Sequence, residues 1–254
     1  MLKETLITSK ANPRFRELRA TASEGGASRT HTLLLGLKVL EAWATAASFD
    51  RLEPQRWLRL EGAPRQALQE RFPCEEWILG EALMRDLAEA ATPPSLVLLA
   101  RLGPEVAAPL ADRVIVPWGI QDPGNLGAIL RSAAAFGFQD ALLGPGCADP
   151  FSPKALRGSM GAAFLLPCRR VERLPLDGGR WFALDGGEGA LPLDRADLSG
   201  PVRILVGNEG HGWRDAHLPP QVTRLAIPME GVESLNAAVA AGIACYEVAR
   251  RMSS

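Results

Sequence analysis

Three short, strongly apolar runs, each followed by a glycine or a proline, limit most strictly what this chain can fold into. They occupy residues 114–116, 141–143 and 202–206. Strands this apolar are typical of a parallel sheet that is covered on both faces. Apolar residues at helical spacing occur at 124–136 and 235–252. We therefore expect an α/β fold built on a parallel sheet.

The length of the chain, 254 residues, is sufficient for one large domain or two modest ones. Strand and helix patterns alternate in the N-terminal part too, with a helix expected over 76–90 and a strand over 96–100. We therefore expect a small α/β domain over residues 1–104 and a second α/β domain over residues 112–254.

The charge of the chain is nearly balanced, with a net charge of −1 at pH 7. Proteins that bind nucleic acids usually carry a basic excess, so the total charge argues mildly against RNA or DNA as a partner. The first 30 residues nevertheless hold six Lys or Arg against three Glu. They form either a solvated helix or a surface that contacts phosphates. The side chains that would make such contacts are Lys10, Arg14, Arg16 and Arg19.

The cysteines and the hydropathy pattern indicate the cellular setting. Cys74, Cys147, Cys168 and Cys245 include no Cys-x-x-Cys pair, which disfavours a zinc site or a redox motif. We expect reduced, partly buried thiols in a cytoplasmic protein without a bound metal. The N-terminus lacks the apolar core of a signal peptide. No apolar run approaches the roughly 18 residues of a membrane span, so we expect no membrane association.

Residues 120–131 form the first candidate functional stretch, in which a Pro-Gly turn leads into a predicted helix. Exposed backbone amides at a helix start can hold an anion or an oxygen-rich ligand. Asn125 and Arg131 are the residues able to do chemistry there. Alternatively, Asn125 caps the helix and Arg131 is a surface ion-pair partner. The glycine pattern is neither that of a Rossmann dinucleotide site nor that of a P-loop.

Two further candidate stretches each follow a predicted strand. In residues 204–212 a glycine-rich turn carries an amide and a carboxylate beyond the end of a strand, which is where open α/β sheets bind ligands. The alternative is a turn with incidental polar residues. In residues 227–236 a loop leads into the last helix. Ser234 either caps that helix or forms, with Asn236, the floor of a pocket.

The three stretches together carry a family resemblance. They read Asn-Leu-Gly-Ala-Ile-Leu-Arg over 125–131, Leu-Val-Gly-Asn-Glu-Gly over 205–210, and Ile-Pro-Met-Glu-Gly-Val-Glu-Ser-Leu-Asn over 227–236. In this order and spacing they resemble the signature motifs of the SpoU/TrmH family, the RNA ribose 2'-O-methyltransferases of the SPOUT class. The similarity covers 114–247. The N-terminal part looks, more weakly, like the ribosomal-protein-like substrate-binding domain of that family.

The resemblance implies a Rossmann-like parallel sheet whose C-terminal segment forms a trefoil knot. It also implies a homodimer, an RNA substrate and S-adenosylmethionine as cofactor, with no metal. The cofactor-binding residues would be Leu184, Gly207, Asn208, Gly210, Ile227, Met229, Ser234 and Leu235.

The same resemblance implies which residues carry the catalysis. They would be Asn125, Arg131, Glu209, Ser234 and Asn236. Because a guanidinium is hard to deprotonate, we expect Arg131 to bind the RNA, clamping the target phosphate and stabilising alkoxide charge. In this family the corresponding arginine is sometimes written as the general base, so a role of Arg131 as proton acceptor stays open, and Glu209 is a second candidate for that role.

Three readings of the function stay open. We favour ribosomal RNA as the substrate, because the additional N-terminal domain resembles that of rRNA-modifying members. One alternative is a tRNA 2'-O-methyltransferase, and another is a weakly catalytic RNA-binding or ribosome-assembly protein of the same fold. A nicotinamide-dependent enzyme would need a glycine fingerprint that the chain lacks.

Overall fold

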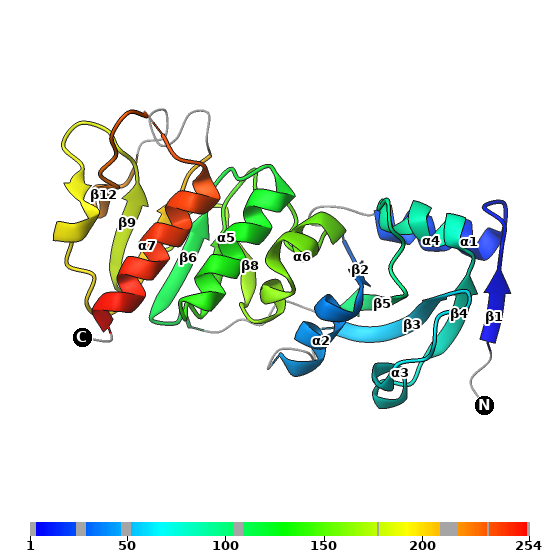
Figure 1. Cartoon of the computed structure of the whole chain (residues 1–254). Coiled ribbons are helices and arrows are strands. Elements are labelled where there is room, and N and C mark those ends of the chain that lie inside the picture. Colours follow the sequence, from blue (N-terminus) through cyan, green and yellow to red (C-terminus); the bar gives the residue numbers. More distant parts are fainter. Residues whose placement is uncertain are drawn as a thin grey trace.

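The computed structural model describes residues 4–23, 29–46, 52–103, 109–176, 178–208, 218–232 and 234–252. These residues form two sheets, one from β1–β5 and one from β6–β12. Figure 1 shows the two sheets in two halves of an elongated molecule, with the termini at opposite ends. No helix of the described residues is long and apolar enough to cross a membrane. All four cysteines are free, and three of them are buried.

The N-terminal half is a mixed five-stranded sheet with strand order β1-β4-β3-β5-β2. The pairs β1–β4 and β3–β4 are parallel, whereas β3–β5 and β2–β5 are antiparallel. Its elements are β1 (Glu4–Ile7), α1 (Pro13–Ser23), β2 (His31–Leu35), α2 (Leu37–Thr45), β3 (Leu52–Leu60), α3 (Ala67–Arg71), β4 (Glu75–Leu79), α4 (Glu81–Ala88) and β5 (Leu96–Leu102).

The helix expected over 76–90 is wrong in its first part, because β4 occupies that stretch and α4 begins only after Gly80. The strand lies between β1 and β3. Its Glu76 is only 1% exposed and pairs with Arg59 on β3. Pairing with two neighbouring strands thus decides the conformation of a segment whose local spacing also suits a helix.

The C-terminal half is a seven-stranded sheet with strand order β10-β12-β9-β11-β6-β7-β8. Each of its six strand pairs is parallel, which confirms the predicted parallel sheet. Its elements are β6 (Arg113–Pro117), α5 (Pro123–Ala135), β7 (Asp140–Leu143), α6 (Pro153–Ser159), η3 (Ala162–Phe164), β8 (Cys168–Arg170), β9 (Arg180–Leu184), β10 (Leu191–Pro192), η4 (Leu193–Arg195), β11 (Val202–Val206), β12 (Val222–Ala226) and α7 (Ala237–Met252).

Both faces of this sheet are covered. On one face, α5 and α7 lie side by side (Figure 1) over a core that includes Ile115, Ile204 and Ala244. On the other face, Val114, Leu205 and their neighbours form a separate cluster. Alternate residues of the same strands therefore enter two different cores, which explains why the strand sequences are apolar almost throughout.

The order of the strands reverses at β6. After β6 the chain forms β7 and then β8 on one side of β6. The later strands β9 to β12 lie on the other side, with β11 directly next to β6. The ends of β6 and β11 are direct neighbours, because Pro117 pairs with Val206. Such a switch point leaves a crevice beyond the carboxyl ends of the strands, where α/β proteins bind ligands. The loops after β6 and β11 are the first two candidate stretches.

Candidate active site

The first stretch begins α5, and Asp122 caps that helix. Its Oδ1 accepts a hydrogen bond from the backbone N–H of Asn125 at 2.9 Å. Its other oxygen accepts from Lys154 of α6 at 2.5 Å. The Lys154 hydrogen bond, followed by that of the Asn125 backbone, lowers the pKa of Asp122 below its ordinary value. The alternative in which Asn125 caps the helix is therefore wrong, because the Asp122 carboxylate is the cap.

The third stretch ends at α7, and Asn236 caps that helix. Asn236 Oδ1 accepts from the backbone N–H groups of Ala238 at 2.9 Å and Val239 at 3.3 Å. Ser234 is exposed and lies two residues before the cap, so the alternative of a Ser234 cap is wrong. Asn236 satisfies two of the backbone N–H groups that the start of a helix leaves without partners.

Asn125 and Asn236 join the first and third stretches. Asn236 Nδ2 donates a hydrogen bond to Asn125 Oδ1 at 3.3 Å, across 111 residues of sequence. The starts of α5 and α7 are thus held together by two side-chain amides. Arg131 lies farther along α5, where it is exposed, while Leu130 beside it is fully buried. A fixed helix therefore presents a charged guanidinium to solvent.

The second stretch meets the first at the switch point. Asn208 lies against Gly119 in the loop after β6, because a Cβ built on Gly119 would be 3.4 Å from Asn208 Nδ2. Gly119 has φ +69°, a backbone conformation that glycine adopts without steric cost. The backbones at Trp118 and Val206 are also hydrogen-bonded, at 2.9 Å. The loops that follow β6 and β11 therefore pack directly on each other.

Leu184, Gly207 and Ile227, three of the residues predicted to bind the cofactor, lie at the carboxyl ends of neighbouring strands of this sheet. Leu184 pairs with Val206 on one side and with Leu225 on the other. Gly207 and Ile227 each follow the end of a neighbouring strand by one residue. Leu184 and Ile227 are partly buried against the same core.

The loop after β12 holds the remaining described cofactor candidates. Met229 is 37% exposed, Ser234 is exposed and Leu235 is half-buried. The cofactor candidate Gly210 and the catalytic candidate Glu209 lie outside the described residues.

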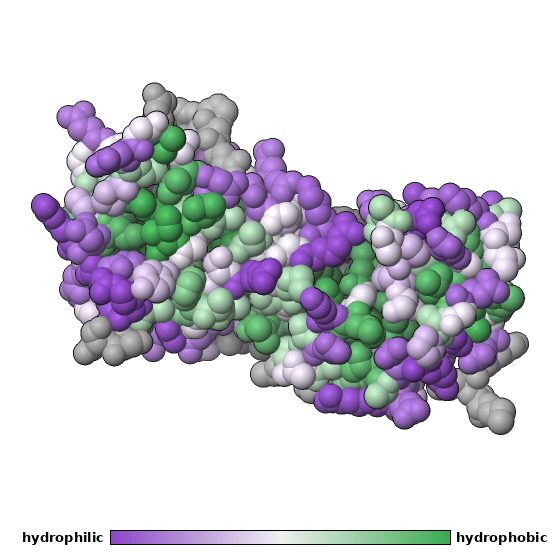
Figure 2. Space-filling view, viewed as in Figure 1, coloured by the Kyte–Doolittle hydropathy of each residue, from purple (hydrophilic) through white to green (hydrophobic). Residues whose placement is uncertain are grey.

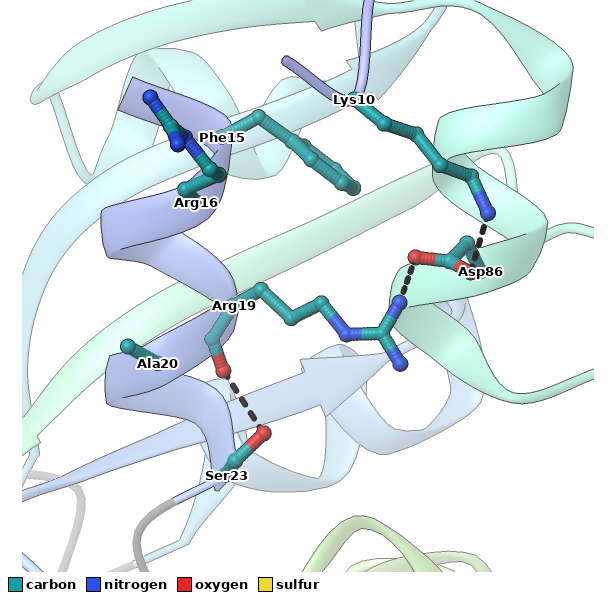
Figure 3. A pocket seen from close by; sticks show the side chains of 7 residues that line it. All are labelled: Lys10, Phe15, Arg16, Arg19, Ala20, Ser23 and Asp86. Carbon is teal, nitrogen blue, oxygen red and sulfur yellow. Dashed lines mark hydrogen bonds and ion pairs between the residues drawn. The ribbon is translucent and has the colours of Figure 1, made fainter. Parts of the chain in front are cut away.

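Four of the five residues predicted to bind RNA lie in the N-terminal half, away from this edge (Figure 1), and the fifth, Arg131, lies on α5. Lys10 Nζ pairs with Asp86 at 2.7 Å, and Arg19 pairs with the same carboxylate, so two of the four basic charges share one counter-charge. Figure 3 shows these three side chains meeting beside Phe15. The two cations hold the pKa of Asp86 below its ordinary value, the Lys10 hydrogen bond having the largest effect.

Arg14 and Arg16, the other two predicted residues, both lie on α1 but make different contacts. Arg14 donates to Thr5 Oγ1 at 3.3 Å and lies 5.8 Å from the centre of the Trp77 ring. Arg16 lines the surface hollow of about 340 Å³ that is drawn in Figure 3. The structure thus brings Lys10, Arg16 and Arg19 to one hollow, places Arg14 at Thr5 and Trp77, and brings none of the four to Arg131.

Asp185 also lies at the carboxyl-end edge of the sheet, and it is not among the functional residues predicted from the sequence. It follows β9 directly, and its side chain is only 10% exposed. Its Oδ1 accepts from the Gly187 backbone at 3.1 Å, while its buried Oδ2 lies 3.5 Å from Arg224 Nη1 without a hydrogen bond. A carboxylate directly after an apolar strand is the sequence signal that could have identified it.

Comparison with known proteins identifies the family. The model of the SpoU rRNA Methylase family matches residues 112–246, more than half of the chain. The chain belongs to this family. It is 32% identical over 257 residues to an uncharacterized tRNA/rRNA methyltransferase of Synechocystis, covering 96% of this chain and 93% of that protein. It is 34% identical over 179 residues to the Bacillus subtilis 23S rRNA (guanosine(2553)-2'-O)-methyltransferase RlmP, covering 68% of this chain and 71% of that protein.

Solved structures agree on the fold. A crystal structure of an RNA 2'-O ribose methyltransferase is 28% identical, with a TM-score of 0.78, and the match covers 98% of this chain and 100% of that one. The AdoMet-bound rRNA methyltransferase of Sinorhizobium meliloti is 23% identical, with a TM-score of 0.80 and 99% of both chains covered. As a member of the SpoU family, this chain is an RNA methyltransferase with S-adenosylmethionine as methyl donor.

The residues at the edge fit this cofactor. Leu184, Ile227 and Leu235 offer partly buried apolar surface suited to an adenine ring. Gly207 has no side chain to keep a ligand from the backbone. The buried, unbonded oxygen of Asp185 can accept a hydrogen bond from a hydroxyl or an ammonium group. Among the described residues, no group of His, Cys, Asp and Glu could hold a metal ion.

Proposed function

We propose that this chain methylates ribose 2'-hydroxyl groups of ribosomal RNA. The observation that carries the proposal is the Asn125–Asn236 hydrogen bond, which joins the start of the Arg131 helix to the loop after β12 at the ligand-binding edge. The names of relatives support the RNA class. They include RlmP and the 23S rRNA (guanosine-2'-O-)-methyltransferase RlmB of Pseudomonas syringae, which is 28% identical over 98% of this chain.

The proposed chemistry needs alignment more than acid or base strength. S-adenosylmethionine supplies a methyl group on a positively charged sulfur, which is already a good leaving group. Arg131 supplies a planar, positively charged guanidinium that can bind oxygen atoms with two parallel N–H groups. It stabilises negative charge that develops on the ribose oxygen and holds the adjacent phosphate. Asn125 and Asn236 fix the helix that carries it, and such alignment contributes up to roughly 7–11 kcal/mol in intramolecular reactions.

The other predicted residues have supporting roles in this proposal. Glu209 accepts the ribose proton, and Ser234 orients the substrate hydroxyl. The cofactor contacts are Leu184, Gly207, Asn208, Gly210, Ile227, Met229, Ser234 and Leu235.

Residues 112–254 form the catalytic domain in this proposal, and the C-terminal segment forms the trefoil knot of the SPOUT class. The topology supports a crossing of this kind, because β12 enters the sheet between β9 and β10, two strands that precede it in the chain. Residues 1–104 form the RNA-binding domain, with Lys10, Arg14, Arg16 and Arg19 as phosphate contacts whose affinity falls with salt. The cytoplasmic location stays a prediction.

The proposed enzyme is a homodimer that uses the outer face of α5 and α7. A groove of about 610 Å³ runs between these helices, with Asn125 and Asn236 among its lining residues. Val239, Ile243 and Tyr246 expose apolar surface there, at 50%, 38% and 53%. Figure 2 shows an apolar patch over this part of the molecule. A second copy would cover the patch and lie next to the active residues.

One substitution and its control test the dimer. Ile243→Glu places a charge in the groove and should give a monomer by size-exclusion chromatography with light scattering. Leu165→Glu is the control, because Leu165 is also exposed, at 54%, but is not part of the groove. A dimeric Ile243→Glu variant would contradict this choice of interface.

Transfer of radioactive methyl groups from S-adenosylmethionine to purified RNA tests the function. Label should enter ribosomal RNA, and mapping should place it at a ribose 2'-oxygen. Label in tRNA alone would support the alternative substrate. Binding of RNA without any transfer would support the weakly catalytic assembly protein instead.

A further inference from the structure

We propose that Arg29 and Asp149 are positioning residues that hold the N-terminal half in a fixed register with the catalytic helix α5. The two side chains form an ion pair between the halves of the molecule, and they are only 7% and 11% exposed. Arg29 precedes β2, and Asp149 follows β7. The inference rests on the proposed role of the N-terminal half in RNA binding.

Other direct contacts surround this ion pair. Thr32 Oγ1 on β2 donates to the Phe151 carbonyl at 2.5 Å. Arg157 Nη1 on α6 donates to the Ala88 carbonyl at the end of α4 at 3.0 Å. The halves also approach closely at Gly161, where an added Cβ would lie 2.5 Å from the Ala42 side chain. The N-terminal half therefore rests on α6, on η3 and on the loop that precedes α6.

Asp149 connects this contact to α6. Its Oδ1 accepts from the Phe151 backbone at 2.9 Å, and its carbonyl accepts from Ser152 N at 3.1 Å. Ser152 in turn caps α6 through Ala155 N at 3.3 Å. One aspartate thus organises the turn that starts α6 and also binds the arginine from the other half.

From α6 the contacts continue to the active residues. A Cβ on Gly127 of α5 would lie 2.4 Å from the Ala155 carbonyl, so the two helices meet backbone to backbone. Lys154 of α6 pairs with Asp122, the cap of α5, which binds the backbone of Asn125. A shift of the N-terminal half would therefore move α6 and, with it, the helix that carries Arg131.

The energetics favour positioning over stabilisation. A buried ion pair gains little net stability, because desolvation of both charges offsets their attraction. The ion pair nevertheless requires a strict relative position of the two side chains, because a guanidinium donates along fixed directions. Arg29 also donates from Nη1 to the His31 carbonyl at 3.3 Å, which fixes the guanidinium within the N-terminal half. The pair therefore restricts the relative orientation of the halves more than it raises the free energy of unfolding.

Steady-state methylation of ribosomal RNA by the full chain tests this proposal. Arg29→Met leaves Asp149 buried without its cation, whereas Arg29→Met with Asp149→Asn removes both charges. We expect both variants to reduce kcat, by up to about 100-fold for a displacement near one ångström. The dissociation constants for S-adenosylmethionine and RNA should stay within about twofold. The double variant should regain the thermal stability that the single variant loses. Arg29→Lys should restore part of kcat.

Two results would overturn the inference. The first is a double variant that regains kcat together with stability, because the pair would then act through stability alone. The second is a single variant with wild-type kcat. The exposed pair of Arg101 and Glu53 lies within the N-terminal half, and Arg101→Met is the matched control that should leave kcat unchanged.

Hydrogen exchange, measured without RNA, separates this inference from the proposed function. Both charge-removal variants should exchange faster than the wild-type chain at the backbone amides of Phe151 and Ser152, which the turn at Asp149 holds. Unchanged exchange at these amides would contradict the coupling even if no RNA were methylated. Absence of methyl transfer by the wild-type chain would contradict the proposed function and not the coupling.

Discussion

Asn236 makes two kinds of hydrogen bond, and substitution can separate them. Its Oδ1 caps α7 through two backbone N–H groups, and its Nδ2 donates to Asn125. Asn236→Ala removes both functions. Asn236→Ser keeps the cap, because serine is about as good a cap as asparagine. It withdraws the donor from Asn125, since the serine side chain is shorter by one bond of about 1.5 Å.

The two variants should therefore differ in stability. Loss of the cap costs about 1 kcal/mol, and loss of the bond to the half-buried Asn125 costs about 1 kcal/mol more. Asn236→Ala should lower the free energy of unfolding by about 2 kcal/mol, and Asn236→Ser by about 1 kcal/mol. For a chain of this size, each kcal/mol corresponds to about 2–4 °C in Tm. Urea and thermal unfolding would measure the difference.

Catalysis should respond differently. If the Asn125–Asn236 bond aligns the Arg131 helix with the cofactor loop, both variants should lose methyl transfer alike, by about tenfold or more. The affinity for S-adenosylmethionine, measured by calorimetry, should change less than twofold. An Asn236→Ser variant with wild-type transfer beside a slow Asn236→Ala variant would refute the reasoning. Asn236 would then act only as a helix cap.

Three further predictions concern α5. Arg131→Ala should abolish most methyl transfer without changing affinity for S-adenosylmethionine in calorimetry, and Arg131→Lys should also be slow because lysine lacks the planar fork; normal turnover of either would exclude the proposed role. Gly127→Ala should destabilise the chain severely in urea, because its Cβ would lie 2.4 Å from the Ala155 carbonyl; an unchanged midpoint would show that α6 can move away. The pKa of Asp122 is lowered on folding, so its contribution to stability is present above its ordinary pKa and is lost as the pH falls through the folded value. Asp122→Asn should flatten that acid limb, and identical acid-unfolding curves would contradict this assignment.

The sequence by itself determined the class of the fold and the family. The run at 202–206 is apolar except for Arg203, is short and is followed by a glycine, and this pattern predicted a buried strand of a parallel sheet. The motifs that end at Arg131 and Asn236 identified a SpoU methylase, because a family match depends on residue types in order and not on their distances. The turns after the strands were also predictable, since glycine and proline act locally.

Only the tertiary structure decided how these residues are used. Asp122, and not Asn125, caps α5, because the amide of Asn125 bonds to a residue 111 positions later. The sequence offered Ser234 as the cap of α7, whereas the structure places the Asn236 side chain on the backbone N–H groups of Ala238 and Val239. In the N-terminal half, Lys10 and Arg19 share the carboxylate of a residue from another helix. Caps, ion pairs and strand partners depend on which segments the fold brings within about 3 Å of each other, and local sequence carries no record of that distance.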